Sequence, residues 1–154
     1  MLATARKAFT LVEILIVVVI LGILAAIVVP RFSNASTQSS QTAFVTTLNE
    51  LAKIANITYQ MNGQHPAEHT YGIMPTEYDQ YLDAAEWAME TPIGGNWDIV
   101  SGGTVTFGVG VFFATSPPTD AFMVEIDALY DDGVLTSGGF QKIGTGAFYV
   151  IMVP

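Results

Sequence analysis

Three aspartates close together near the carboxy end form the clearest set of oxygen ligands in this chain. Asp127, Asp131 and Asp132 precede Gly133, and a Thr-Ser pair follows at residues 136–137. Carboxylate, hydroxyl and carbonyl oxygens around a glycine turn suit Ca²⁺, which accepts irregular coordination. The spacing is not that of an EF-hand, and an Asp-Gly turn that ends a helix explains the same residues. We expect no cofactor for the chain, with Ca²⁺ as a candidate ligand of this turn alone.

A single carboxylate, that of Glu13, lies near the start of an otherwise apolar run. Apart from Thr10, Glu13 and Gly22, residues 9–29 are all plainly apolar. At about 1.5 Å per residue, a helix of this length would cross the roughly 30 Å hydrocarbon core of a bilayer. A carboxylate inside such a span costs about 2.5 kcal/mol or more unless it is paired, and it indicates a function. We therefore expect Glu13 to have a partner.

Other kinds of chemistry find no support in the sequence. No serine, cysteine or histidine arrangement marks a nucleophile, and no glycine-rich run follows a strand and opens a helix, as phosphate binding requires. His65 and His69 are four residues apart, but Pro66 disrupts the helix that would align them on a zinc ion. We expect two solvent-facing loop histidines. A formal net charge of −9 argues against a nucleic-acid surface. The expectation is a protein that is not an enzyme and has no nucleic-acid partner.

The apolar run and the segment after it are predicted to form one long helix over residues 9–62, with Gly63 as its end. Pro30 removes one backbone hydrogen bond and should kink this helix. Apolar side chains recur at helical spacing from residue 44 to residue 59, which predicts packing on a globular domain. The predicted parts are residues 1–8 ahead of the helix, 9–30 in a membrane or filament core, 31–62 as the soluble half of the helix, and 63–154 as one globular domain.

The globular domain is predicted to contain a small antiparallel sheet. Apolar side chains recur at every second position of residues 104–114, and the glycines between them indicate close backbone approach or a twist on one face. Further strands are predicted over residues 97–100, 138–143 and 147–153, and short helices over 76–87 and 119–130, the last with a strand as its alternative. About four strands packed on the long helix give an α+β fold.

The segment Lys7-Ala8-Phe9-Thr10-Leu11-Val12-Glu13 resembles the prepilin leader shared by type IV pilins and the pseudopilins of type II secretion systems. The usual pattern is a basic residue, Gly, Phe, Thr, Leu, any residue and Glu, followed by an apolar run. Ala8 stands here where the family usually has Gly, and Gly22 and Pro30 lie where such proteins often carry Gly and Pro. The resemblance covers residues 6–31 and implies a pilin-like fold and a structural role in a filament.

The resemblance also implies a processing step. A prepilin peptidase would remove residues 1–8 by cutting between Ala8 and Phe9, and would N-methylate Phe9. In the family, the glutamate at the position of Glu13 is linked to assembly. A terminal amine is mostly cationic at neutral pH, so the amine of one subunit could neutralise Glu13 of its neighbour. Because an unpaired charge is costly at low dielectric, such a pair sets the register of assembly more than it adds stability.

The expected surroundings of the chain follow from its ends and its composition. Arg6 and Lys7 precede the apolar run, which predicts a single-pass protein of the bacterial inner membrane with a cytoplasmic amino terminus. The implied partners are further copies in a filament, the peptidase, an inner-membrane assembly platform and minor pseudopilins. The sequence has no cysteine, whereas many type IV pilins close a carboxy-terminal loop with a disulfide. This difference favours a pseudopilin, or a pilin lineage without the disulfide, as the subunit of a type II secretion pseudopilus or of a type IV pilus-like filament. Some pseudopilins hold Ca²⁺ in a carboxy-terminal loop. The alternative is a membrane-tethered binding module with an uncleaved anchor.

Overall fold

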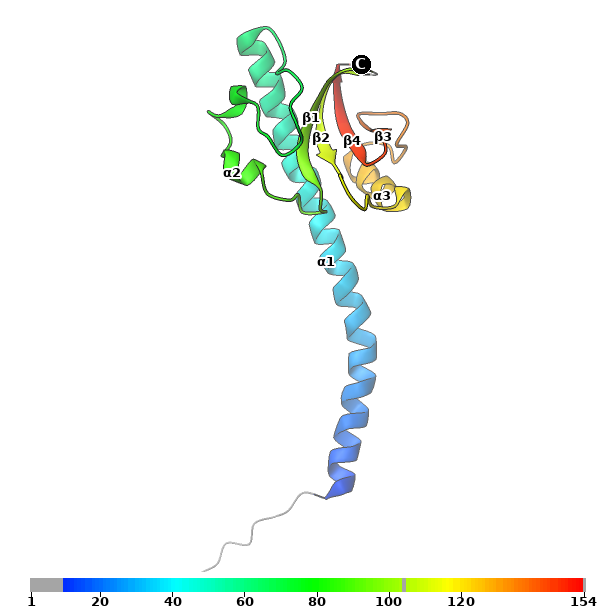
Figure 1. Ribbon diagram of the computed structural model, residues 1–154. Helices are drawn as coiled ribbons and strands as arrows, with labels where there is room; N and C mark the ends of the chain where they lie inside the picture. The colour runs from blue at the N-terminus through cyan, green and yellow to red at the C-terminus, as the bar shows by residue number, and fades with distance from the viewer. Residues whose placement is uncertain (1–9, 104, 154) are drawn as a thin grey trace, which may run out of the picture. The chain divides into compact units, whose positions relative to one another are not determined.

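The computed structural model describes residues 10–103 and 105–153, without the side chains of residues 27–34. It contains a long helix, α1 (Leu11–Asn62), and a four-stranded antiparallel sheet (Figure 1). The strands are β1 (Asn96–Gly102), β2 (Val105–Phe112), β3 (Phe140–Gly144) and β4 (Ala147–Val153), in the order β1-β2-β4-β3. The short helices are η1 (Thr76–Tyr78), α2 (Ala84–Trp87) and α3 (Asp120–Tyr130). This α+β, pilin-like layout confirms the predicted fold class.

The chain forms two compact units, Met1–Gln38 and Ser39–Pro154. The long helix begins in the first unit and ends in the second. It stops at Gly63, which has a φ of 73° that is inexpensive only for glycine. The Gly63 N–H donates to the Tyr59 carbonyl at 2.8 Å and closes the last turn. The helix predicted over residues 9–62 is confirmed from Leu11 onward, and Phe9 lies outside the described residues. The helix continues through Pro30, where the kink stays a prediction.

The second half of α1 packs one stripe of side chains into the core, as its helical spacing predicts. Phe44, Leu48 and Ala55 have no exposed surface. The ring of Phe44 stacks on that of Trp97 from β1, with centroids 5.3 Å apart, and meets the ring of Phe140 from β3 edge-on at 6.4 Å. Aromatic contacts of this kind add about 0.5–1.5 kcal/mol each to the free energy of burial. Phe44 of α1 thus contacts both edge strands of the sheet, β1 and β3.

The central strand β2 shows the two faces of the sheet most clearly. Phe107, Val109 and Val111 are fully buried in the core that α1 covers. Between them, Gly108 and Gly110 belong to the opposite face, because successive residues of a strand point to opposite sides. At Gly110 an added Cβ would lie 2.6 Å from the Tyr149 Cα of the neighbouring strand. The predicted close backbone approach at these glycines is therefore confirmed.

The prediction of a single short helix over residues 76–87 is wrong. The structure has η1 and α2 in its place, with a break between them. Tyr78 ends η1 with no exposed surface, so its burial overrides the continuation of the helix. The chain becomes helical again after Asp83, whose carboxylate accepts the Ala85 N–H at 2.7 Å as an N-cap.

The helix predicted over residues 119–130 corresponds to α3. Its N-cap is Thr119, whose hydroxyl accepts the Phe122 N–H at 3.3 Å. Met123 and Ile126 are fully buried in the core on this helix, and so is the charged residue Asp127. The buried side of α3 therefore carries a carboxylate into the interior at the end next to the aspartate turn.

Candidate functional site

The amino end of α1 is closed by a reciprocal pair of side chains. The Thr10 N–H and the Thr10 hydroxyl both donate to Glu13 Oε2, at 2.8 and 2.9 Å. In return the Glu13 N–H donates to the Thr10 hydroxyl oxygen at 3.2 Å. This is a capping box, which satisfies backbone N–H groups that the first turn of a helix leaves free. Glu13 also lies at the end of α1 where the helix dipole favours a negative charge.

Thr10 is a hydrogen-bond partner of Glu13 that the sequence reasoning missed. We expected a cationic partner for Glu13, and within the subunit the carboxylate is held by Thr10. The signal was present in the sequence, since Thr10-Leu11-Val12-Glu13 has the Thr-x-x-Glu spacing of a capping box ahead of an apolar run. Ala8 and Phe9, the residues of the predicted cleavage bond, lie outside the described residues.

The apolar side chains that follow Glu13 are largely exposed as far as Leu24. Every large apolar residue from Leu11 to Leu24 is at least half exposed. Among the residues that the structure describes, no helix has the length and apolarity required to span a membrane. The segment predicted to do so, residues 9–29, extends at both ends past the residues whose side chains are described. Exposed apolar surface of this extent indicates a site of association.

The predicted aspartate cluster is brought together at the carboxy end of α3. Asp127 is fully buried, whereas Asp131 and Asp132 are exposed, and one carboxylate oxygen from each lies within 4.8 Å of the others. Both oxygens of Asp127 are buried without a hydrogen-bond partner. A buried carboxylate without donors is unfavourable unless a proton or a cation compensates it. The arrangement therefore fits a small cation with oxygen ligands.

Backbone donors hold the two exposed aspartates in place. Asp131 Oδ1 accepts the Asp132 N–H at 2.7 Å, and Asp131 Oδ2 accepts the N–H groups of Gly139 and Phe140. Asp132 accepts the Val134 N–H at 2.8 Å and a hydroxyl from residue 137 at 3.0 Å. These hydrogen bonds orient the carboxylates of Asp131 and Asp132 beside Asp127.

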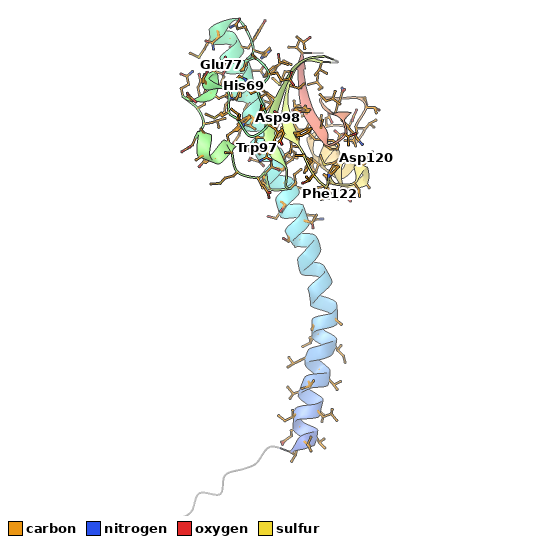
Figure 2. The ribbon with its side chains drawn as sticks, viewed as in Figure 1. His69, Glu77, Trp97, Asp98, Asp120 and Phe122 are labelled. Atoms are coloured by element: carbon orange, nitrogen blue, oxygen red, sulfur yellow. The ribbon has the colours of Figure 1, made fainter. Side chains whose placement is uncertain are left out.

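Among the side chains that the structure describes, no basic group forms an ion pair with the aspartate cluster. Burial, the interaction with Asp131 and the negative charges of Asp131 and Asp132 together raise the pKa of Asp127 to about 7, in spite of the opposing effect of the Val134 N–H. Burial also raises the pKa of Asp131, but the interaction with Asp127 and the backbone donors outweigh it, so that pKa is lowered. Lys142 forms its ion pair at 2.6 Å with Asp120, the residue at the start of α3 that is labelled in Figure 2. Near neutral pH, a proton or a cation would compensate the buried carboxylate of Asp127.

The histidines do not form a metal site. His65 lies between the rings of Tyr59 and Phe107, with centroid distances of 4.5 and 4.0 Å. Its Nδ1 is buried without a partner, and burial lowers the pKa of His65. His69 lies apart from it, in a cleft on the sheet. The expectation of two solvent-facing loop histidines is therefore wrong for His65, because Phe107 is too distant in sequence for the stacking to be foreseen.

Comparison with known proteins gives one family match, to the amino-terminal segment. Residues 4–29 match the family model of the prokaryotic N-terminal methylation motif. The match includes the segment from Lys7 to Glu13 and the apolar run after it, and it is consistent with the type IV pilin and pseudopilin family. No solved structure matches the chain.

Proposed function

From the premise that residues 4–29 are a prokaryotic N-terminal methylation motif, we propose that this protein is the structural subunit of a pilin-like filament, specifically of a type II secretion pseudopilus. The motif carries the pilin-like part of the proposal, and the absence of cysteine favours the pseudopilus. A prepilin peptidase removes residues 1–8 and methylates the new amino terminus at Phe9. The subunit is stored in the inner membrane with its amino end in the cytoplasm, and it assembles through α1 on an inner-membrane platform together with minor pseudopilins.

Two features of α1 support assembly through this helix. Its apolar side chains from Leu11 to Leu24 are exposed, so they are available to bury surface against lipid or against other subunits. Glu13 interrupts that surface and is held by Thr10 inside the subunit. Pairing of Glu13 with the terminal amine of a neighbour would exchange this internal contact for one between subunits. Membrane insertion and filament assembly would then both use α1, which would first be surrounded by lipid and then by other subunits.

The processing step is tested by intact mass and amino-terminal sequencing of the membrane-extracted protein. The expected mature chain begins with N-methylated Phe9. A chain that retains Met1 would refute processing, and would favour a membrane-tethered binding module with an uncleaved anchor. The Ala8→Gly variant is the matched control, because it restores the usual residue of the motif and should be processed at least as completely as the wild type.

The role of Glu13 is tested by two substitutions that separate its charge from its capping function. Glu13→Ala removes both, whereas Glu13→Gln removes the charge but still accepts the Thr10 donors, since Gln serves in capping boxes. We expect both variants to insert into membranes normally and to enter filaments poorly, measured in sheared filament fractions. Normal incorporation of Glu13→Gln would contradict the charge pairing and leave the cap as the relevant contact.

The absence of cysteine supports the pseudopilus over the type IV pilus, because no disulfide can close a carboxy-terminal loop. The choice is tested by deleting the gene and measuring secretion of exported enzymes beside twitching motility and surface piliation. Loss of secretion with normal piliation is the expected result. Loss of piliation with normal secretion would overturn the pseudopilus assignment and leave a pilin.

We also propose that the turn formed by Asp127, Asp131 and Asp132 binds Ca²⁺. The buried carboxylate of Asp127, which has no donor, favours this second proposal. A bound ion would compensate that carboxylate and fix the end of α3 to the loop before β3. The melting temperature of the full chain in detergent should rise in millimolar Ca²⁺ and should return to its original value when a chelator is added. No shift in the wild type, or an equal shift in Asp127→Asn, would exclude the site.

A further inference from the structure

The loop between α1 and η1 is held at two points, with an accessible segment between them. The His65 ring at its start lies between aromatic rings of α1 and β2, and Met74 near its end is buried in the core. Residues 67–72, which we call the flap, are exposed or half-buried. The Gly72 N–H donates to the carbonyl of Trp97 in the edge strand β1 at 2.9 Å and attaches the flap to the sheet. Loop segments of this kind open at a lower free energy than the strands beside them.

The flap and Asp98 of β1 line the same cleft, which has a volume of about 770 Å³. Asp98 alternates along β1 with Trp97 and Ile99, which belong to the core under α1. Its side chain therefore lies on the opposite, outer face of the sheet. Glu68 and His69 bring two titratable side chains of the flap to this cleft, and His69 and Asp98 are labelled in Figure 2.

The carboxylate of Asp98 has a hydrogen-bond donor for only one of its oxygens. Asp98, Gly110 and Tyr149 are register partners across β1, β2 and β4. Because Gly110 has no side chain, Asp98 Oδ2 reaches the Tyr149 hydroxyl over the middle strand and accepts its hydrogen bond at 2.6 Å. Oδ1 is buried and has no hydrogen-bond partner within the described chain. An unpaired, buried oxygen is costly for a charged carboxylate, so this environment favours the protonated acid.

The groups around Asp98 supply a second negative charge and no fixed positive one. Burial and the negative charge of Glu68 together raise the pKa of Asp98 to about 6, in spite of the hydrogen bonds that its carboxylate accepts. Burial, the bond to Asp98 and the two acidic charges raise the pKa of Tyr149, so the phenol remains the donor. No lysine or arginine lines the cleft in the part of the chain that the structure describes, and its other titratable groups are His69 and the exposed phenol of Tyr71.

Ionisation of Asp98 would act on the flap in two ways. The charged carboxylate would gain from contact with water at its buried oxygen, and it would repel Glu68. Movement of the flap satisfies both demands, because the strands that form the other walls of the cleft are held by the sheet. We propose that the flap closes on the outer face of the sheet while Asp98 is protonated and opens when Asp98 ionises. This switch does not depend on the proposed filament role.

Hydrogen exchange of the Gly72 amide, in the full-length protein in detergent micelles, tests the proposal. Its bond to the Trp97 carbonyl should break when the flap opens. Protection factors correct for the pH dependence of chemical exchange and are compared at pH 5 and pH 7. With a pKa of 3.8 for Asp98 in the open flap and of about 6 in the closed one, the ratio of open to closed flap should rise at most about tenfold. Solvent screens part of the effect, so we expect a rise of about threefold to tenfold.

Three variants identify the group that controls the flap. Asp98→Asn keeps an acceptor for Tyr149 but cannot ionise, so the protection of Gly72 should be equal at the two pH values. Glu68→Gln changes an exposed residue and should lower the ratio of open to closed flap about twofold at pH 7, which provides a test if Asp98→Asn fails to fold. Asp79→Asn, an exposed residue outside the cleft, is the matched control and should behave like its parent. All proteins are compared in a His69→Gln background, so that this histidine does not contribute to the pH dependence.

Low concentrations of urea separate opening of the flap from unfolding of the whole domain. A local opening exposes little surface, so exchange of Gly72 at pH 7 should hardly change with urea below the unfolding transition. Three results would overturn the proposal. These are equal protection of Gly72 at pH 5 and pH 7 in the parent protein, the same pH dependence in Asp98→Asn, and exchange that urea accelerates as strongly as it does global unfolding.

Discussion

The substitution Asp98→Asn should change how the stability of this protein depends on pH. Asp98 is partly buried on the outer face of the sheet, and its pKa is raised from the usual 3.8 to about 6, chiefly by burial. Below pH 3.8 the group is protonated in both the folded and the unfolded chain, so its contribution to stability is then fully present. That contribution is lost as the pH rises through 6, because folding then buries a carboxylate. Asparagine cannot ionise and avoids this loss.

The size of the effect follows from the pKa change. A rise from 3.8 to about 6 corresponds to at most about 3 kcal/mol. Asp98 retains some exposure, and solvent screens the effect of Glu68, so we expect about 1–2 kcal/mol. The free energy of unfolding of Asp98→Asn minus that of the wild type should therefore increase by this amount from pH 4 to pH 7. Tyr149 keeps its acceptor in the variant, so the hydrogen bond does not obscure the comparison.

Urea unfolding of the full chain in detergent, followed by tryptophan fluorescence, provides the measurement. Trp87 and Trp97 are both buried and should report the loss of the core. The difference between the variant and the wild type removes the contributions of other titrating groups, including Asp127. Asp79→Asn should reproduce the pH dependence of the wild type. A difference that stays constant from pH 4 to pH 7, or that decreases, would refute the burial of a titrating carboxylate at Asp98.

Further predictions concern the core, the sheet and the aspartate turn. Phe44→Ala should lower the free energy of unfolding by about 3–5 kcal/mol, because it empties a fully buried site between two rings; a loss below about 1 kcal/mol in the same urea assay would contradict this packing. Gly110→Ala should cost at least about 2 kcal/mol through its clash with β4, whereas Gly144→Ala, with its nearest contact at 3.7 Å, should cost less than about 1 kcal/mol; equal costs would disprove the close approach. Ca²⁺ at a hundred times its dissociation constant should stabilise the wild type by about 2.7 kcal/mol and leave Asp127→Asn unchanged, as measured by thermal melting; an equal gain in both would place the ion elsewhere.

Local periodicity predicted much of the fold. The spacing of apolar residues predicts both the buried stripe on α1 and the alternation of buried side chains along β2. The structure buries these residues as expected. The helix over residues 76–87 failed because the burial of Tyr78 depends on the rest of the core. Local helix propensity does not contain that information.

The candidate sites also divide into those that local sequence predicts and those that it does not. The aspartate cluster could be predicted because its three members lie within one helical turn and the loop that follows. The pairing of Asp98 with Tyr149 could not, since it depends on the register of three strands. The stacking of His65 on Phe107 likewise joins a loop to the central strand. Contacts of this kind follow from topology, which a single sequence constrains only weakly.

The continuity of α1 has a mechanical consequence for a subunit that is pulled. The helix that begins at Leu11 also supplies Phe44, Leu48 and Ala55 to the core of the second unit. Tension applied at its amino end would be carried along a ladder of backbone hydrogen bonds directly into packed side chains, without a loop that could extend first. Force would have to draw the helix out of the core across many contacts at once. The subunit is therefore expected to resist stretching and to fail abruptly when it yields.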